Sequence, residues 1–306
     1  MTSSNPVPWL TGHIPDLPTP FDAAGEIDRK AFVRLCARQI EAGASALVVC
    51  ETTGEASTLA PAEHGLLIRI AVDVAQSRAK IIAGAGSNST SHAIELTQAA
   101  EAAGADAIMS VVPYYNKPMQ EGIAAHFQAI ALSTDLPIIL HDIPSRTVRE
   151  LADDTLLRLA ERRQFVGLRD ATGDPTRPMR LATRMPRRFR LLSGDDQTVL
   201  AFVAAGGDGC ISVAANVAPD LCRAISASCR QGRLQTARYL QRRLAPLAAC
   251  LAKESPAAVK YGLSLLGLMR ATTRLPLVEL DEVSRDAVTS ALAEIADEDL
   301  MGAAEA

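Results

Sequence analysis

The residues whose side chains are best suited to binding or catalysis stand at the ends of short apolar runs. Arg169 follows the run of residues 165–168, and His141 follows the run of residues 137–140. A guanidinium is a permanent cation that can hold a carboxylate through parallel N–H donors. An imidazole can hold or move a proton near neutral pH. Arg169 therefore needs an anionic partner, and His141 could hold or move a proton.

Further polar segments follow apolar runs in the same way. They add hydroxyl, carboxylate and guanidinium groups that could contact a small polar ligand. The segments are residues 51–55 (ETTGE), 112–118 (VPYYNKP), 142–147 (DIPSRT), 170–173 (DATG), 193–196 (SGDD) and 209–216 (GCISVAAN).

Helical and apolar segments alternate along most of the chain. Three times an amphipathic segment ends at a glycine, namely Gly43, Gly104 or Gly206, and a short apolar run follows. Glycine suits the left-handed residue that closes a helix, and a fully apolar run suits a buried parallel strand. Eight strand–helix units over roughly 220 residues predict an α/β fold, a (β/α)8 TIM barrel. A doubly wound open sheet is the alternative.

Local signals place individual helices and divide the chain. Asp28 is predicted to cap one helix and Pro61 to begin another. From residue 219 to about residue 295 the pattern is entirely helical, which is more than a last barrel unit needs. We expect residues 1–218 to form the main part of the barrel and residues 219–306 its last helix and a C-terminal helical extension. The tail, residues 297–306, is expected to fray.

Composition limits the class of partner. The chain has 306 residues, 48% of them hydrophobic, and a net charge of −4. This balance favours a soluble globular protein and gives no reason to expect a nucleic acid. No apolar run is long enough to cross a membrane, and the first residues lack the pattern of a signal peptide, so a cytoplasmic location is expected. The six cysteines form no C-x-x-C pair, and the five histidines are scattered. We therefore expect buried free thiols, no metal and no cofactor.

The polar segments, in this order, resemble those of the dihydrodipicolinate synthase / N-acetylneuraminate lyase family of class I aldolase-like enzymes. The resemblance runs from about Gly12 to Leu292 and rests on the motifs TTGE, PYYN, IPSRT, ATG and SGDD. It is greatest to the dihydrodipicolinate synthase branch. It implies a barrel that binds a 2-oxo acid, such as pyruvate, at the carboxyl ends of its strands.

The resemblance also implies roles for individual residues. Thr52 and Thr53 correspond to threonines that hydrogen-bond the 2-oxo acid and carry a proton relay. Tyr115 corresponds to a relay tyrosine that a neighbouring subunit supplies, in a homodimer or homotetramer. Arg146 corresponds to an arginine that holds a substrate carboxylate. Core packing for Tyr115 and a surface salt bridge for Arg146 are the alternatives. The other expected ligand contacts are Gly194, Ile211 and Asp16.

Two positions depart from the family at its central chemistry. The lysine that forms a Schiff base corresponds to Arg169, and a proton-shuttling tyrosine corresponds to His141. A Schiff base needs a neutral amine, which an arginine in a protein effectively never provides. Only Lys117, in a rim loop, is a conceivable replacement. We therefore expect Schiff-base catalysis to be lost.

A cation at Arg169 inside the barrel mouth needs an anionic partner. Alternation along the first strand turns Asp16 into the barrel, whereas alternation turns Glu51 and Asp142 outward. We predict a buried ion pair between Asp16 and Arg169. His141 is interpreted as a neutral hydrogen-bonding neighbour of Arg169 in preference to a general base.

Three functions stay open for this chain. The first is non-covalent binding of a 2-oxo acid or another small carboxylate. The second is an active lyase or aldolase of different chemistry, in which Arg169 stabilises an enolate and His141 moves the proton. The third is a non-catalytic interaction protein whose relict site is closed by Asp16 and Arg169.

Overall fold

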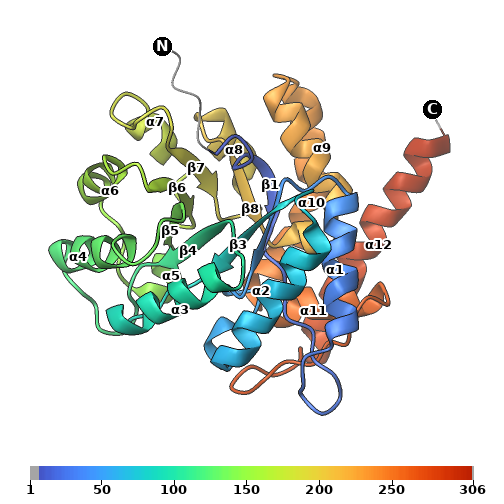
Figure 1. The fold of residues 1–306 in the computed structure, drawn as a ribbon. Coiled ribbons are helices and arrows are strands. Elements are labelled where there is room, and N and C mark those ends of the chain that lie inside the picture. The colour runs from blue at the N-terminus through green and yellow to red at the C-terminus, as the bar shows by residue number, and fades with distance from the viewer. Residues whose placement is uncertain (1–6, 305–306) are drawn as a thin grey trace.

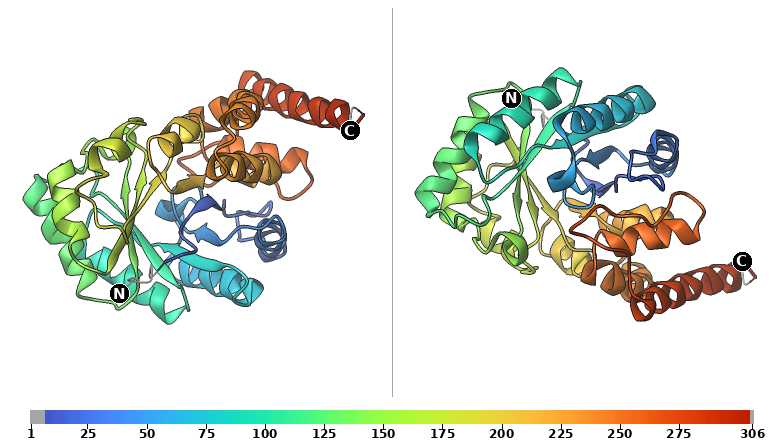
Figure 2. Two further views of the ribbon diagram at one scale, coloured as in Figure 1. Left: turned by 90° about the horizontal axis from the view of Figure 1, so that it is seen from above. Right: turned by 90° about the horizontal axis from the view of Figure 1, so that it is seen from below.

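Eight parallel strands form a barrel surrounded by helices in the computed structural model, which describes residues 7–304 and their side chains as far as residue 296. The end-on views of Figure 2 show the ring of strands inside the ring of helices. The predicted TIM barrel is confirmed. The strands are β1 (Gly12–Pro15), β2 (Ala46–Val49), β3 (Lys80–Gly84), β4 (Ala107–Val111), β5 (Ile138–Asp142), β6 (Phe165–Asp170), β7 (Arg190–Ser193) and β8 (Gly209–Ser212).

Closure of the sheet excludes the open-sheet alternative. β1 pairs in parallel with β8, so the first and last strands are neighbours. Between β1 and β2 the closure is a bridge of Asp16 with Val48, and the amide of Leu17 donates to the Val48 carbonyl at 2.9 Å. Asp16 therefore lies at the seam of the barrel.

The helices follow the strands in the order that the sequence predicts (Figure 1). Asp28 caps α1, its side chain accepting from the Ala31 amide at 2.9 Å, and Pro61 begins α2. Both predictions are confirmed. The helices around the barrel are α1 (Arg29–Glu41), α2 (Pro61–Ala75), α3 (Thr90–Ala102), α4 (Gln120–Ala131), α5 (Pro144–Thr147), α6 (Asp153–Ala160), α7 (Arg177–Leu181), α8 (Val199–Ala204) and α9 (Pro219–Arg230), with short 3-10 turns η1 (Ala56–Thr58) and η2 (Ala214–Asn216).

Three more helices follow α9, so the C-terminal helical extension is present. They are α10 (Leu234–Lys253), α11 (Ala257–Leu265) and α12 (Glu282–Ala304). Figures 1 and 2 show α12 pointing away from the barrel. Residues 297–304 of the tail belong to α12, and the fraying of this end stays a prediction. Residues 305–306 lie outside the described part of the chain.

Alternation along the strands separates an inner from an outer apolar cluster. The inner cluster fills the barrel and includes Ile14, Val48, Ile139 and Ile211. The outer cluster lies between strands and helices and includes Leu47. Since successive strand residues face opposite sides, each of the strands from β2 to β7 contributes to both clusters. The polar residues at the strand ends therefore lie above the apolar inner cluster, which forms the floor of the barrel mouth.

Candidate active site

A cavity of about 540 Å³ opens at the carboxyl ends of the strands. This is the end at which TIM barrels carry their chemistry. Its lining includes Thr52 and Thr53 from the loop after β2, His141 and Arg169 from the ends of β5 and β6, and Gly194 directly after β7.

Arg169 and Asp16 form the predicted buried ion pair. Arg169 Nη1 lies 2.8 Å from Asp16 Oδ2, and the side chains are 4% and 0% exposed. Burial tends to lower the pKa of Arg169, but the neighbouring carboxylates of Asp16 and Glu51 raise it above its ordinary value. Burial raises the pKa of Asp16, and Arg169 opposes that shift. The guanidinium at the end of β6 is therefore a permanent cation held by a carboxylate from β1.

Glu51 also faces Arg169, which corrects the prediction that it turns outward. Its carboxylate lies 3.4 Å from Arg169 Nη1. The cause is Cys50, whose φ of 56° interrupts the alternation after Val49, so that Val49 and Cys50 both join the outer cluster. Cys50 would otherwise point into the barrel, and Glu51 turns inward as a result. Asp142 does turn away from Arg169, as predicted.

Glu51 joins His141 to this cluster. His141 Nδ1 lies 2.9 Å from Glu51 Oε1, and His141 is paired in register with Arg169 across β5 and β6. Burial tends to raise the pKa of Glu51, but the contacts with His141 and Arg169 hold it well below its ordinary range. The Thr52 amide also donates to Glu51. The site thus contains two carboxylates, one guanidinium and one imidazole, which are linked in the order Asp16, Arg169, Glu51 and His141.

Relatives of known function place the chain in one family. A family model described as the dihydrodipicolinate synthetase family matches residues 9–295. The chain belongs to this family. It is 46% identical over 282 residues to a 4-hydroxy-tetrahydrodipicolinate synthase of Gluconobacter oxydans (strain 621H), covering 92% of this chain and 95% of the relative. It is 47% identical over 285 residues to the same enzyme of Hyphomonas neptunium (strain ATCC 15444), covering 92% and 97%.

Solved structures of the family share the fold. The 4-hydroxy-tetrahydrodipicolinate synthase of Methylacidiphilum fumariolicum SolV matches with a TM-score of 0.91 and 40% identity, over 94% of this chain and 96% of that one. The dihydrodipicolinate synthase of Acinetobacter baumannii, solved in complex with pyruvate, matches with a TM-score of 0.91 and 42% identity, over 94% and 99%. The second of these family members binds pyruvate.

The residues expected to contact a ligand divide into two groups in this family member. Thr52, Arg146 and Gly194 line the cavity, and Arg146 stands exposed at its mouth with Nη2 3.2 Å from the Ser255 carbonyl. Ile211 does not line it, because its inward-facing side chain belongs to the apolar floor one layer deeper. Tyr115 is 89% exposed on the rim. Core packing for Tyr115 is therefore excluded within this subunit.

Two predicted site residues are already engaged with each other. The Thr53 hydroxyl donates to Asp16 Oδ2 at 2.8 Å. Asp16 thus accepts hydrogen bonds from both Arg169 and Thr53. It is not among the described residues that line the cavity, and it lies beneath them. Thr52 is the threonine of the pair whose side chain has no such contact.

The lysines of the chain stand apart from the cavity. Its described lining includes no lysine. Lys117 lies in the exposed rim loop. Lys260, on α11, is fully buried, where it contacts Glu55 and donates to the Thr272 carbonyl at 2.9 Å. Burial lowers the pKa of Lys260 to about 8. Its ammonium group contacts Glu55 in the loop after β2 and therefore does not reach the cavity.

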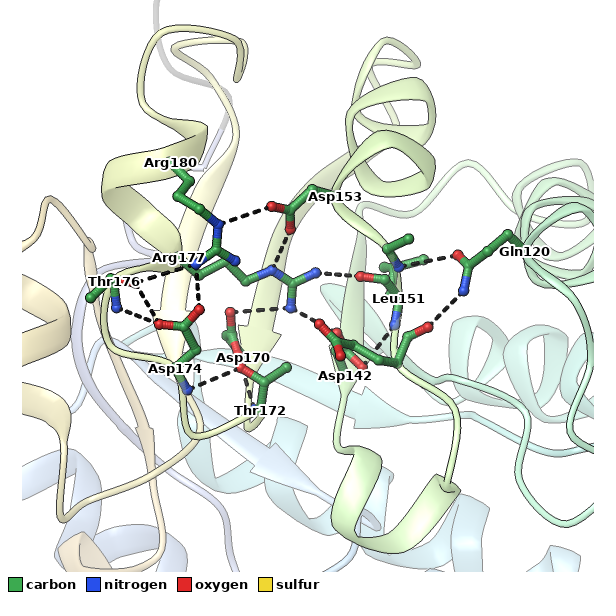
Figure 3. A network of polar contacts seen from close by, with 12 residues as sticks. Gln120, Asp142, Leu151, Asp153, Asp170, Thr172, Asp174, Thr176, Arg177 and Arg180 are labelled. Atoms are coloured by element: carbon green, nitrogen blue, oxygen red, sulfur yellow. Dashed lines mark hydrogen bonds and ion pairs between the residues drawn. The ribbon is translucent and has the colours of Figure 1, made fainter.

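A second buried network, which sequence reasoning missed, lies behind the ends of β5 and β6. Arg177 Nη1 lies 2.7 Å from Asp142 and 3.3 Å from Asp170, and Arg177 Nε lies 2.9 Å from Asp153 (Figure 3). Arg177 also donates to the Leu151 carbonyl. Burial raises the pKa of Asp142 to about 6, and Arg177 opposes that shift. The network fixes the residues that directly follow His141 and Arg169. Two buried aspartates after neighbouring strands were the signal for it.

Two features of the described residues bear on possible partners. Within the described residues, no three or more His, Cys, Asp or Glu side chains gather in a way that could hold a metal ion. No helix in that part of the chain is both long and apolar enough to cross a membrane.

Proposed function

We propose that this protein binds a small 2-oxo acid such as pyruvate at the barrel mouth without forming a Schiff base. The observation that carries the proposal is the commitment of Arg169 to Asp16 at 2.8 Å, at the strand end where the family resemblance implies the reactive lysine. A guanidinium cannot be deprotonated under ordinary conditions and is a poor nucleophile. No lysine among the described cavity residues replaces it.

Non-covalent contacts for such a ligand are available in the cavity. Arg146 offers an exposed guanidinium at the mouth, which suits a carboxylate. Thr52 offers a hydroxyl. A side chain at Gly194 would meet Ala171 Cβ at 2.9 Å and the Arg169 side chain at 3.2 Å, so glycine keeps this part of the site open. The Acinetobacter baumannii relative in complex with pyruvate supports the choice of ligand.

The proposal also includes the oligomeric state of the protein and its location in the cell. We expect a homodimer or homotetramer in which Tyr115 reaches a neighbouring subunit, because its side chain has no cover within its own. We also expect the protein to act in the cytoplasm.

Borohydride reduction in the presence of pyruvate tests the loss of the Schiff base. The wild-type chain should show no adduct by mass spectrometry, while isothermal titration calorimetry with pyruvate should show binding. The positive control is a variant with Arg169→Lys and His141→Tyr, made with and without Asp16→Ala. The triple variant should trap pyruvate more readily, because a carboxylate beside a lysine keeps its amine protonated.

Two outcomes would overturn the proposal. An adduct on the wild-type chain would show that another amine does the covalent chemistry. If calorimetry detects no binding of pyruvate, oxalate or another small carboxylate, the result would favour a closed relict site. That alternative is supported by the burial of Arg169 and His141.

A further inference from the structure

We propose that Glu51 and His141 form a proton-transfer dyad that removes a proton from the carbon next to the carbonyl of the bound 2-oxo acid. The proposal rests on the proposed function, since it needs the ligand in the cavity. His141 is the catalytic residue of the dyad, and Glu51 is its positioning residue.

The contacts around Glu51 fix the orientation of the imidazole. Glu51 Oε1 lies 2.9 Å from His141 Nδ1, while the Thr52 amide and Arg169 hold the other oxygen, Oε2. An ionised carboxylate only accepts hydrogen bonds, so Nδ1 must carry a proton. In the neutral ring the lone pair then lies on Nε2. A carboxylate that orients a histidine base in this way is a recurring arrangement in enzymes.

His141 Nε2 is the atom left for a ligand. It is buried and has no hydrogen-bond partner among the described residues. His141 lines the cavity, and its other ring nitrogen is occupied by Glu51. A buried polar atom without a partner is costly and rare in folded proteins. An acidic C–H of a bound ligand would face this free lone pair.

Arg169 supplies the complementary charge. It stands beside His141 across β5 and β6, and its Nε also lacks a partner in the described part of the chain. A base and an unpaired cationic N–H donor therefore lie side by side. A 2-oxo acid matches both, because its carbonyl oxygen accepts a hydrogen bond and the neighbouring C–H becomes acidic.

The proposed step is a proton transfer that needs no other reactant. The C–H bond next to the carbonyl breaks and its proton goes to His141 Nε2. The electron pair forms a C=C bond, and the carbonyl π electrons move to oxygen, where Arg169 stabilises the enolate. The resulting imidazolium is stabilised by Glu51. Return of a proton from His141, after exchange with solvent, regenerates the ligand.

Proton NMR of pyruvate in deuterated water tests the dyad. With wild-type protein the methyl signal should decay through exchange faster than in buffer alone. His141→Gln should abolish the enhancement, and Glu51→Gln should lower it by about 100-fold, the usual contribution of a positioned base. Glu51→Asp, which keeps the charge, should restore part of the rate. The pyruvate dissociation constant of each variant should stay within a few-fold of wild type.

Glu63→Gln is the matched control, because Glu63 is also ion-paired but contacts Arg274 instead of the dyad. Its exchange rate should equal that of wild type. If pyruvate does not bind the wild-type chain, the proposed function fails. If pyruvate binds but does not exchange, or if Glu51→Gln or His141→Gln exchanges as fast as wild type, binding stands and the dyad is overturned. If Glu51→Gln does not fold, the comparison of His141→Gln with wild type still tests the dyad. The exchange rate of the wild-type protein can be measured in either case.

Discussion

Arg169 places a permanent positive charge beneath the barrel mouth, and two carboxylates share it. Asp16 lies at 2.8 Å and Glu51 at 3.4 Å from the same nitrogen. Glu51 also contacts His141 and so connects the cation to the imidazole. It is also the residue for which strand alternation predicts the wrong direction. The chemistry open to this site is therefore decided by how individual charges are paired.

Removing Asp16 should destabilise the protein. Asp16→Ala leaves a buried guanidinium with only the longer contact to Glu51, so we expect a loss of about 3 kcal/mol in the free energy of unfolding. Urea denaturation followed by far-UV circular dichroism measures it. Replacing both partners, with Asp16→Ala and Arg169→Met, should recover most of the loss. A single-variant loss below about 1 kcal/mol, the size of a surface pair, would contradict the buried pair.

At the scale of elements, the carboxyl ends of β5 and β6 hold the site in register. His141 pairs with Arg169, and the next pair in register is Asp142 with Asp170. Arg177 on α7 bridges both aspartates, while Asp153 at the start of α6 holds Arg177 from outside. The helices thus position the strand ends through one guanidinium.

Arg177→Met should remove this support. Asp142 and Asp170 would then face each other buried and unpaired, and we expect a loss of about 3 kcal/mol in the free energy of unfolding. The loss should be smaller at pH 5 than at pH 8, because the raised pKa of Asp142 lets it take up a proton. Urea denaturation at both pH values measures it.

Arg180→Met is the control on the same helix. Arg180 pairs with Asp153 and Asp174 near the surface, so its loss should cost less than about 1 kcal/mol. Equal losses for the two variants would contradict a special role for Arg177.

At the scale of the whole molecule, buried histidines make stability depend on pH. His126 on α4 is 5% exposed, and burial lowers its pKa to about 4, from 6.5 in an unfolded chain. Because the folded-state pKa is depressed, its contribution is full above pH 6.5 and is lost as the pH falls toward 4.

His126→Gln should flatten this dependence. Between pH 7 and pH 5 the wild-type chain should lose about 1–2 kcal/mol more than the variant does. Urea midpoints at the two pH values measure the difference. His92→Gln, at an exposed position, should behave like wild type. A variant as sensitive to pH as the wild type would show that His126 is protonated in the folded state.

An exposed apolar rim predicts association between subunits. Tyr115 and Met119 are 89% and 80% exposed, and Val148 lies close by, because Arg149 Nε donates to the Lys117 carbonyl at 3.2 Å. Light scattering coupled to size exclusion should show a dimer or tetramer. Tyr115→Asp should shift it toward smaller species, whereas Val283→Asp on α12 should not. A monomeric wild-type chain would contradict the expectation.

The sequence by itself determined the barrel, its helical extension and the Asp16–Arg169 pair. Repeated glycines and apolar runs set the order of elements, and strand alternation is local, so it placed Asp16 correctly. Only the tertiary structure decided the place of Glu51, because the left-handed backbone at Cys50 reverses the alternation. It also decided the Arg177 network, since that residue reaches Asp142 from 35 positions away. The contact of a helix residue such as Arg177 with the strand ends depends on how the helices pack onto the strands, and no local pattern contains that information.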